Sequence, residues 1–586
     1  MPLLPIAQYK PDISDYEGNS TRNIRNVVPQ GDGYGPFSNF AGFTKTLPGA
    51  CRGGFYALNS DGTVAIFAGT ATDLYQLNNT NYSWTKVSAG AVSYPALSAS
   101  AQWQFAQTGN LVFATQANTV LQVFTVGTSS AFSAALGSPP QAAYITVIGQ
   151  FLVLSGLLSQ PFRIQWSGLG LFNSSSAWTA GLNSSDFQDF PDGGVVRGVA
   201  GGDQSGIIFQ DQVIRSMAFV AGSPYVFQIS KETQGLGLQA PYSLVQSGGN
   251  ILFYSGKGFH IIPPGGQPTP IGRERIDRTF INNLDIGNMQ LFMAAADPRS
   301  TRVYWAYKST AGAANLYDGL LGYDTLLDRF FPVQASGQFL LGLSQSGITL
   351  EALDPIAPTP LTITGAAASP TSNGSGGFLI RLTLAAETNP NFTILNQSAI
   401  VVYGVTGTTE ANSIATNPAT PNANWKFTVI DATHIDLLGS TFTNAYTGGG
   451  QVGGSVDAMT LSFDDYPTAV QPQLAQFDAT GTLGFFSGSN LEATVQTAEQ
   501  GTDEQRLDIR GFRPITDATT VKGSLIYRDT QQATPIQGAP VGLSRIGRCD
   551  MTRDTRYARF QLDIPAGSNW TFVAGVVPDT GAGSAI

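Results

Sequence analysis

The sequence predicts an all-β protein whose main part is a β-propeller. The 586-residue chain contains 67 glycines, and only 12% of its residues are charged. Glycine-rich chains with many Thr, Val and Phe residues form short strands joined by tight turns, whereas amphipathic helices need Glu, Lys, Leu and Ala at helical spacing. No convincing run of that helical kind occurs. The third observation is a repeated pattern of short apolar strands.

Each repeat begins with a turn residue, often glycine, followed by an apolar strand, a polar turn and a second strand. The repeats begin at Thr63, Gly109, Gly149, Gly206, Gly249, Thr301 and, more weakly, Phe339. Their spacing of roughly 40 to 57 residues matches a four-stranded propeller blade, and we expect about six to eight blades. A row of β-sandwiches is the alternative, because it also produces short strands at regular spacing.

The most apolar stretch is Ala142–Leu158. It is short for a membrane helix, and Gly149-Gln150 interrupts it, so we expect two buried strands joined at that turn. The N-terminus lacks the charged region and the long apolar region of a signal peptide. We therefore expect no membrane anchor.

Changes in composition divide the chain into four segments. Residues 1–45 are polar with little periodicity and predict an extended N-terminal arm. Residues 46–355 carry the repeats and predict the first part of the propeller. Residues 356–455 predict an inserted domain, and residues 456–586 predict the propeller closure and a C-terminal β region. Within the last segment, YARFQLDI alternates polar and apolar residues and predicts a half-exposed strand.

The inserted segment contains VTGTTEAN (405–412) and VIDATHIDL (429–437). These residues resemble the FCCH module, a small β-barrel-like domain first described in ubiquitin-activating enzymes and common as an insertion in phage tail proteins. The resemblance covers about 50 residues of the chain and implies a fold. It does not imply ubiquitin chemistry, because the segment has no cysteine.

The net charge of −10 and the pI of about 4.8 argue against tight binding to duplex DNA, which needs a basic surface. The same charge is compatible with a surface that DNA passes without adhering, because like charges repel. The two cysteines, Cys51 and Cys549, exclude a disulfide framework, and two separate thiols are favoured over a single bridge.

No catalytic, cofactor-binding or metal site is predicted. The two histidines, His260 and His434, lie far apart in the sequence without carboxylate or cysteine neighbours at ligand spacing. A glycosidase would need two carboxyl groups about 5–9.5 Å apart. The candidates for that pair are Asp186, Asp189, Asp192, Asp464 and Asp465, for which turn capping is the favoured role.

Two groups of arginines are interleaved with acidic residues. The first contains Arg273, Arg275 and Arg278, and the second contains Arg545, Arg548, Arg553, Arg556 and Arg559. Surface ion pairs within the chain are the simpler interpretation. The functional interpretation is a set of intersubunit contacts, because the guanidinium group pairs well with the carboxylates of a neighbour. We assign that candidate role to Arg273, Arg275, Arg278, Arg548, Arg553 and Arg556.

Several stretches resemble the tail nozzle family (tail tubular protein B) of short-tailed bacteriophages. They are PLLPIAQYKPDISDY, STRNIRNVVP, DPRSTRVYWAYKS, GLLGYDTLLDRFFPV and YARFQLDIPAGSNWTFVAGV. The resemblance is diffuse over most of the chain. It implies a structural virion protein, made in the bacterial cytoplasm, that forms a hexameric ring below the portal and adaptor. It also implies a tube for DNA without specific binding, and docking of tail fibres or spikes. We expect carboxylates from propeller loops to line that tube.

Two other functions remain open. A carbohydrate-binding propeller is favoured if Trp84, Trp103, Trp166, Trp178 or Trp305 is exposed to stack on sugars, although most of these residues are expected in the blade core. A glycan-degrading propeller enzyme acting on host polysaccharide is favoured only if two of the aspartates named above converge in one pocket.

Overall fold

The computed structural model describes residues 3–14, 20–59, 62–79, 81–223, 225–345, 360–386, 393–413, 425–454 and 470–582. The chain divides into two compact units. The first contains Met1–Leu77, Ser83–Ser344 and Pro472–Ile586, and the second contains Asn78–Tyr82 and Gln345–Gln471. No helix in the described ranges has the length and apolar character needed to cross a membrane.

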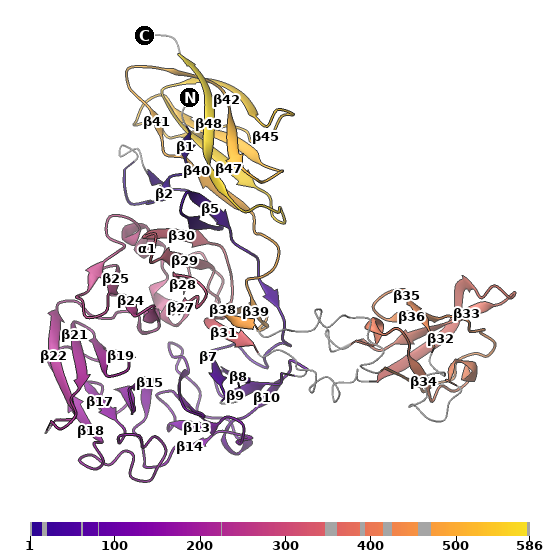
Figure 1. The fold of residues 1–586 in the computed structure, drawn as a ribbon, viewed down its shortest axis with the longest axis horizontal. Helices are drawn as coiled ribbons and strands as arrows, with labels where there is room; N and C mark the ends of the chain where they lie inside the picture. The colour runs from indigo at the N-terminus through magenta and orange to yellow at the C-terminus, as the bar shows by residue number, and fades with distance from the viewer. Residues whose placement is uncertain are drawn as a thin grey trace. The chain divides into compact units, whose positions relative to one another are not determined.

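The predicted propeller is confirmed, because the described residues of the first unit contain seven four-stranded sheets (Figure 1). In each of the first six blades, four consecutive strands pair antiparallel in chain order. Blades 1 to 3 consist of β7 (Gly54–Leu58), β8 (Val64–Gly69), β9 (Leu74–Leu77), β10 (Trp84–Lys86), β11 (Gln104–Thr108), β12 (Leu111–Thr115), β13 (Gln122–Thr125), β14 (Ser133–Ala134), β15 (Ala142–Ile148), β16 (Phe151–Leu157), β17 (Arg163–Trp166) and β18 (Asp186–Asp189).

Blades 4 to 6 follow the same pattern. They consist of β19 (Val196–Gly201), β20 (Ser205–Gln210), β21 (Val213–Phe219), β22 (Phe227–Gln234), β23 (Val245–Ser247), β24 (Asn250–Tyr254), β25 (Phe259–Ile262), β26 (Thr269–Pro270), β27 (Met293–Ala296), β28 (Arg302–Tyr307), β29 (Gly319–Asp324) and β30 (Arg329–Val333). The helical segments are short: η2 (Ala89–Ala91), η3 (Pro241–Ser243), α1 (Asp277–Asn283), η4 (Ile286–Leu291), η5 (Ile394–Asn396) and η6 (Thr409–Ala411).

The repeats found in the sequence mark the second strand of each of the first six blades. β8, β12 and β16, for example, begin one or two residues after Thr63, Gly109 and Gly149. The predicted turn at Gly149-Gln150 joins β15 to β16, and Gly149 has a positive φ of 55°, a conformation that glycine adopts without strain. The repeat pattern missed the first strand of these six blades, of which β15 was expected from the apolar stretch Ala142–Leu158.

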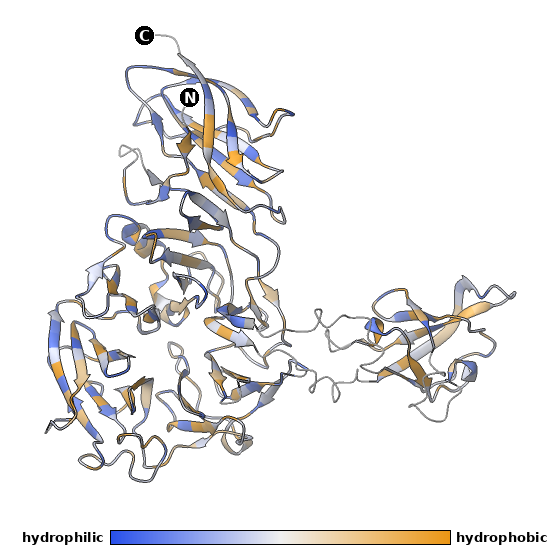
Figure 2. Ribbon diagram, in the orientation of Figure 1, coloured by the Kyte–Doolittle hydropathy of each residue, from blue (hydrophilic) through white to orange (hydrophobic). Residues whose placement is uncertain are grey.

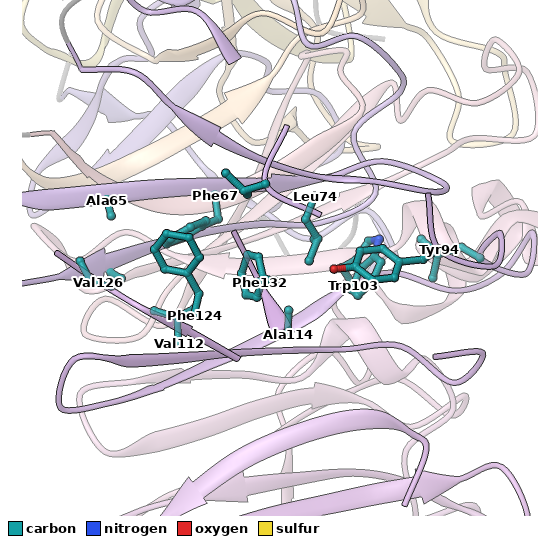
Figure 3. Close-up of a cluster of buried hydrophobic side chains, with 13 residues drawn as sticks. Ala65, Phe67, Leu74, Tyr94, Trp103, Val112, Ala114, Phe124, Val126 and Phe132 are labelled. Carbon is teal, nitrogen blue, oxygen red and sulfur yellow. The ribbon is translucent and has the colours of Figure 1, made fainter. Parts of the chain in front are cut away.

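Blades bury their faces against one another. Between blades 1 and 2, Phe67 contacts Phe124 edge-to-face at 5.0 Å between ring centroids, and Phe132 lies 5.6 Å from Phe67 (Figure 3). Trp103 belongs to the same cluster and is 1% exposed. Figure 2 shows apolar residues recurring along the blade strands. Because a single small sheet cannot bury two apolar faces, this packing requires the blades to stand side by side.

Blade 7 joins distant parts of the chain. Its strands are, in sheet order, β31 (Phe339–Gln345), β38 (Val470–Phe477), β39 (Leu483–Phe485) and β6 (Ala41–Gly42). The outermost strand therefore comes from the N-terminal region and closes the ring of blades. The second unit is inserted in the connection between β31 and β38.

Residues from both chain ends build a β-sandwich. One sheet has the order β4 (Val27–Gln30), β5 (Gly33–Pro36), β48 (Val573–Ala582), β42 (Leu507–Thr516) and β46 (Cys549–Thr555), with β1 (Leu4–Pro5) also pairing with β48. The other contains β40 (Ala493–Gln496), β41 (Gln500–Gly501), β43 (Lys522–Arg528), β44 (Ile536–Gln537), β45 (Val541–Gly542) and β47 (Tyr557–Ile564). Phe512 and Phe560 meet between the two sheets at 5.0 Å.

The N-terminal region differs from the extended arm that the sequence predicts. β1, β4 and β5 lie in the sandwich and β6 lies in blade 7, while β2 (Gln8–Tyr9) pairs with β3 (Ser20–Thr21). These strands have two to four residues, and β1, β5 and β6 pair with strands near the other end of the chain. Local periodicity does not reveal such contacts. The prediction of a half-exposed strand at YARFQLDI was wrong, because Arg559 and Gln561 of β47 are buried.

The second unit has one six-stranded sheet and its own core. The sheet order is β34 (Val401–Tyr403), β37 (Gln451–Gly453), β32 (Leu361–Ser372), β33 (Phe378–Leu384), β36 (His434–Leu437) and β35 (Phe427–Val429). All six strands contribute side chains to a single cluster that includes Ile380, Leu382 and Ile435. Register shifts in β32 accompany the curvature that this shared core requires.

Cys51 and Cys549 are separate, buried thiols. Burial raises the pKa of Cys51 to about 12 and that of Cys549 to about 11. The Sγ atom of Cys51 also lies 3.3 Å from the Gly53 carbonyl oxygen, to which it donates.

We therefore expect neither cysteine to react with iodoacetamide in the folded protein at pH 8. Only the thiolate is nucleophilic, and a pKa three units above the solution pH leaves about one thiol in a thousand ionised. Mass spectrometry of the intact protein should show no adduct under native conditions and two adducts in denaturant. Rapid labelling of either residue in the folded protein would contradict the buried positions.

Candidate functional site

The propeller axis contains a cavity of about 450 Å³, lined by the innermost strand of every blade. Phe55 and Phe105 lie on neighbouring inner strands, with their rings stacked 5.7 Å apart. The described residues of the lining include one arginine, Arg197, and no aspartate or glutamate. This volume suits a small molecule, and it cannot admit duplex DNA, whose major groove alone is about 12 Å wide.

The polar groups of this cavity are uncharged or paired. The rings of Tyr144 and Tyr242 meet edge-to-face at 6.2 Å. Burial raises the pKa of Tyr242 to about 12 and raises that of Tyr144 further, so both phenols are neutral at physiological pH. Arg197 donates from Nε to Asp211 at 2.6 Å. The cavity therefore offers hydrogen-bonding and aromatic surface, with no group poised for acid–base chemistry.

The first arginine group is largely paired within the chain. Arg275 makes two parallel bonds to Asp328, at 2.6 and 2.8 Å, and Tyr323 donates to the same carboxylate at 2.8 Å. Arg278 donates to the Asp12 carbonyl oxygen at 2.6 Å, and its backbone N–H donates to the Asp12 carboxylate at 2.8 Å. The N-terminal segment is thus attached to the start of α1.

In the second group, Arg548 is engaged within the chain. Arg548 bridges two carboxylates: it pairs closely with Asp550 through Nε, and Nη1 lies 2.6 Å from Asp579. Arg556 is half-buried, and its Nε makes no hydrogen bond to any described residue. Arg548 therefore fastens β46 to β48 rather than presenting a free cation.

Two of the six candidate arginines are exposed and make no close hydrogen bond to a described residue, whereas Arg278, although 72% exposed, is held by Asp12. Arg273 is 75% exposed and is only loosely paired with Glu274, at 3.8 Å. Arg553 is exposed, and its guanidinium group lies 3.9 Å from the centroid of the Tyr527 ring. Sequence reasoning missed Asp12 and Asp328 as partners, because each lies more than 50 residues from its arginine.

The candidate carboxylates of blade 3 lie at one groove but are held in ion pairs. Asp189 accepts two bonds from Arg163, at 2.7 and 2.8 Å. Asp192 pairs with Lys231 at 2.6 Å and closely with Arg215, and these bonds lower the pKa of Asp192 to about 2. The bond from Arg163 also lowers the pKa of Asp189. Neither carboxyl group is protonated at neutral pH, so neither can serve as the general acid of a glycosidase.

Among the remaining aspartate candidates, Asp186 does not line this groove. Asp186 pairs in register with Trp166 between β18 and β17, and its Oδ1 accepts from the Phe187 N–H at 2.9 Å. Asp464 and Asp465 lie outside the described residues.

The histidines occupy separate structural positions. His260 is stacked on Phe253 at 5.5 Å and bonded through Nδ1 to the Gly258 carbonyl at 3.0 Å, and burial lowers its pKa. His434 lies in the second unit, 2.9 Å from Asp431. No group of three or more His, Cys, Asp or Glu side chains among the described residues has metal-binding geometry.

The tryptophans weighed for sugar stacking are mostly core residues. Trp103, Trp166, Trp178 and Trp305 are each at most 4% exposed, and Trp84 is half-buried with its Nε1 bonded to the Lys45 carbonyl at 2.9 Å. An exposed aromatic residue that sequence reasoning missed is Tyr225, which is 77% exposed. No apolar periodicity marks it, because it lies in the turn between β21 and β22.

Comparison with known proteins gives distant similarities to solved structures. No protein-family model matches the chain, and no curated protein matches it. Among solved structures, the chain is similar to one described as the crystal structure of the mitotic checkpoint complex, with 10% identity over 53% of this chain and 90% of that chain (TM-score 0.32). It is similar to the WD40 repeats of RRP9, with 7% identity over 60% and 94% (TM-score 0.32). It is also similar to the computationally designed Ika8 protein, with 9% identity over 70% and 98% (TM-score 0.30).

Proposed function

We propose that the protein is a tail nozzle subunit of a short-tailed bacteriophage, which assembles as a hexameric ring below a tail adaptor. In this role it retains the DNA, forms the distal tube for its ejection and provides a platform for fibres or spikes. The proposal assigns the protein to the virion and makes it structural rather than enzymatic. Its first support is the set of sequence stretches that resemble this family.

The structural observation that carries the proposal is the attachment of the propeller to the sandwich. The same N-terminal segment contributes β4 and β5 to the sandwich and, directly after them, β6 to blade 7. Arg302 and Arg329 of blade 6 donate to the carbonyl oxygens of Pro29 and Gln30, at 3.0 and 3.2 Å. A subunit that bears load while DNA passes benefits from two domains joined by several strands and hydrogen bonds rather than by one flexible linker.

The charge of the chain is the second support. A net charge of −10 disfavours adhesion of duplex DNA, since binding depends on neutralising phosphates with Lys and Arg. The axial cavity of a single propeller is too small for a duplex, so we place the DNA passage in the centre of the assembled ring. We propose that carboxylates from propeller loops line this passage. A basic lumen in the assembled particle would contradict this part of the proposal.

The two accessible arginines are the candidates that we retain for intersubunit contact. We expect a protein carrying both Arg273→Glu and Arg553→Glu to form at least tenfold less ring than the wild type at equal concentration, because each change replaces an attractive charge by a repulsive one. Its unfolding free energy should stay within about 1.5 kcal/mol of the wild type, since both positions are exposed and the contact of Arg553 with the Tyr527 ring contributes about 0.5–1 kcal/mol.

Arg510 provides a control for charge reversal. Its side chain is 62% exposed, and among the described residues it forms an ion pair only with the nearby Asp508 in β42. The variant Arg510→Glu should assemble normally if the effect depends on position. Equal loss of assembly in both variants, measured by light scattering, would indicate a general effect of charge and would remove the two arginines from the interface.

The experiment that tests the proposed function is the measurement of mass by light scattering, with and without the adaptor, together with electron microscopy of phage particles. We expect a six-fold ring, or a monomer that forms a ring only on the adaptor, and density for the propeller at the distal tail. A stable monomer that is absent from tails would overturn the proposal.

A further inference from the structure

A groove of about 560 Å³ lies between the outer parts of blades 3 and 4. Gln188, Asp189 and Asp192 line one side of it, and Arg215, Tyr225 and Gln228 line the other. β18 is the outermost strand of blade 3 and β22 that of blade 4. The groove is therefore at the rim of the propeller and separate from the axial cavity.

The ring of Tyr225 lines this groove but is not packed into the protein core. Its side chain is 77% exposed, and its backbone N–H donates to the Ser223 hydroxyl at 3.2 Å. Aromatic rings usually bury a large apolar area, so an exposed one beside polar groups offers a surface for stacking.

Ion pairs and hydrogen bonds within the chain fix the polar side chains of the groove, Asp189, Asp192 and Arg215, without a ligand. Asp189 is bonded to Arg163, whose guanidinium group lies 3.6 Å from the Phe187 ring centroid. Arg215 is 10% exposed, and its Nε donates to the fully buried Gln210 at 3.0 Å. The carboxylates of Asp189 and Asp192 remain 50% and 48% exposed, so each keeps acceptor positions open to the solvent.

We propose that this groove binds a polysaccharide built of neutral hexoses. The C–H face of a pyranose ring is apolar and fits the exposed Tyr225 ring, while its hydroxyl groups both donate and accept. Ionised carboxylates accept from such hydroxyls, and the amides of Gln188 and Gln228 can do both. The lining of the groove contains two carboxylates, Asp189 and Asp192, and one cation, Arg215, which is paired with Asp192. This excess of negative charge disfavours an anionic polymer as the occupant.

This proposal does not depend on the nozzle function, and it assigns binding without cleavage. The blade 3 carboxylates act as hydrogen-bond acceptors, because their ion pairs keep them ionised. A ring-forming protein and a monomeric one would bind the same ligand through the same groove. Each proposal can therefore fail while the other stands.

The test is affinity electrophoresis of the full-length protein in native gels containing dextran, mannan, galactan or alginate. We expect at least one of the three neutral polymers to retard the wild-type protein. The variant Tyr225→Ala should bind that polymer at least tenfold more weakly. Leu326 is also 77% exposed but lies in the turn between β29 and β30, so Leu326→Ala is a matched control that should bind normally.

Three outcomes would overturn the proposal. They are no retardation by any neutral polymer, equal retardation of wild type and Tyr225→Ala, and retardation by alginate alone, which would indicate an ionic surface. Light scattering of Tyr225→Ala should show wild-type assembly, so that loss of glycan binding is distinguished from loss of the ring.

Discussion

Replacing Glu499 by Gln is expected to destabilise the sandwich by about 3–5 kcal/mol, the usual cost of removing one partner from a buried ion pair. Arg528 donates from Nε to Glu499 at 2.9 Å and makes a second, close bond from Nη2 to the other carboxylate oxygen. Arg559 approaches the same carboxylate at 3.6 Å. All three side chains are at most 9% exposed. The amide of glutamine would leave two buried cations without a counter-charge.

Hydrogen exchange at the amides of β43 and β47 measures this effect, since the whole chain has several units and need not unfold in one step. A loss of 3–5 kcal/mol corresponds to a fall in protection of about 150- to 4,000-fold. The control is Asp508→Asn in β42, which removes the exposed pair with Arg510 and should cost less than about 1 kcal/mol. Similar effects of the two changes would show that the buried network contributes little.

The sequence reveals the propeller because the strands in the middle of each blade are buried on both faces. β8 and β12 are apolar runs of this kind, and their turns recur at a blade-like period. Most innermost strands escape the repeat pattern because they face the axial cavity: β11, for example, contains the polar Gln104 and Gln107. Such strands lack the regular alternation of a surface strand. β15 is the exception, since the apolar stretch Ala142–Leu158 predicts it together with β16.

The candidate site is less predictable than the fold, because it depends on contacts between distant segments. The interleaved acids near the arginines suggest local ion pairs, but Arg275 and Arg278 pair with Asp328 and Asp12. β47 alternates polar and apolar residues, yet the counter-charge of Glu499 allows Arg559 to be buried. The sequence around an arginine does not reveal a carboxylate partner that only the tertiary fold brings close to it.

Deleting residues 1–36 is expected to abolish folding of the sandwich although the remaining chain keeps every other strand. β48 would lose β1 and β5 as partners and become an open edge, which favours aggregation. Val27 and Tyr34, both fully buried, would leave the core, and each contributes roughly 1.5–3 kcal/mol. The two together contribute roughly 3–6 kcal/mol, which reaches the lower end of the stability of an ordinary domain, about 5–15 kcal/mol. We expect little soluble protein, and partial rescue by a co-expressed peptide of residues 1–42.

Excision of residues 346–469, a much longer segment, should by contrast leave the propeller and the sandwich at their wild-type unfolding temperatures. β31 and β38 are neighbours in blade 7, so a short glycine-serine linker can join them. The core of the second unit draws all its residues from positions 361–452. Soluble yield and amide exchange in β48 distinguish the two deletions. If the N-terminal deletion were tolerated and the internal excision were not, the conclusion that the N-terminal strands are needed to complete the sandwich would be wrong.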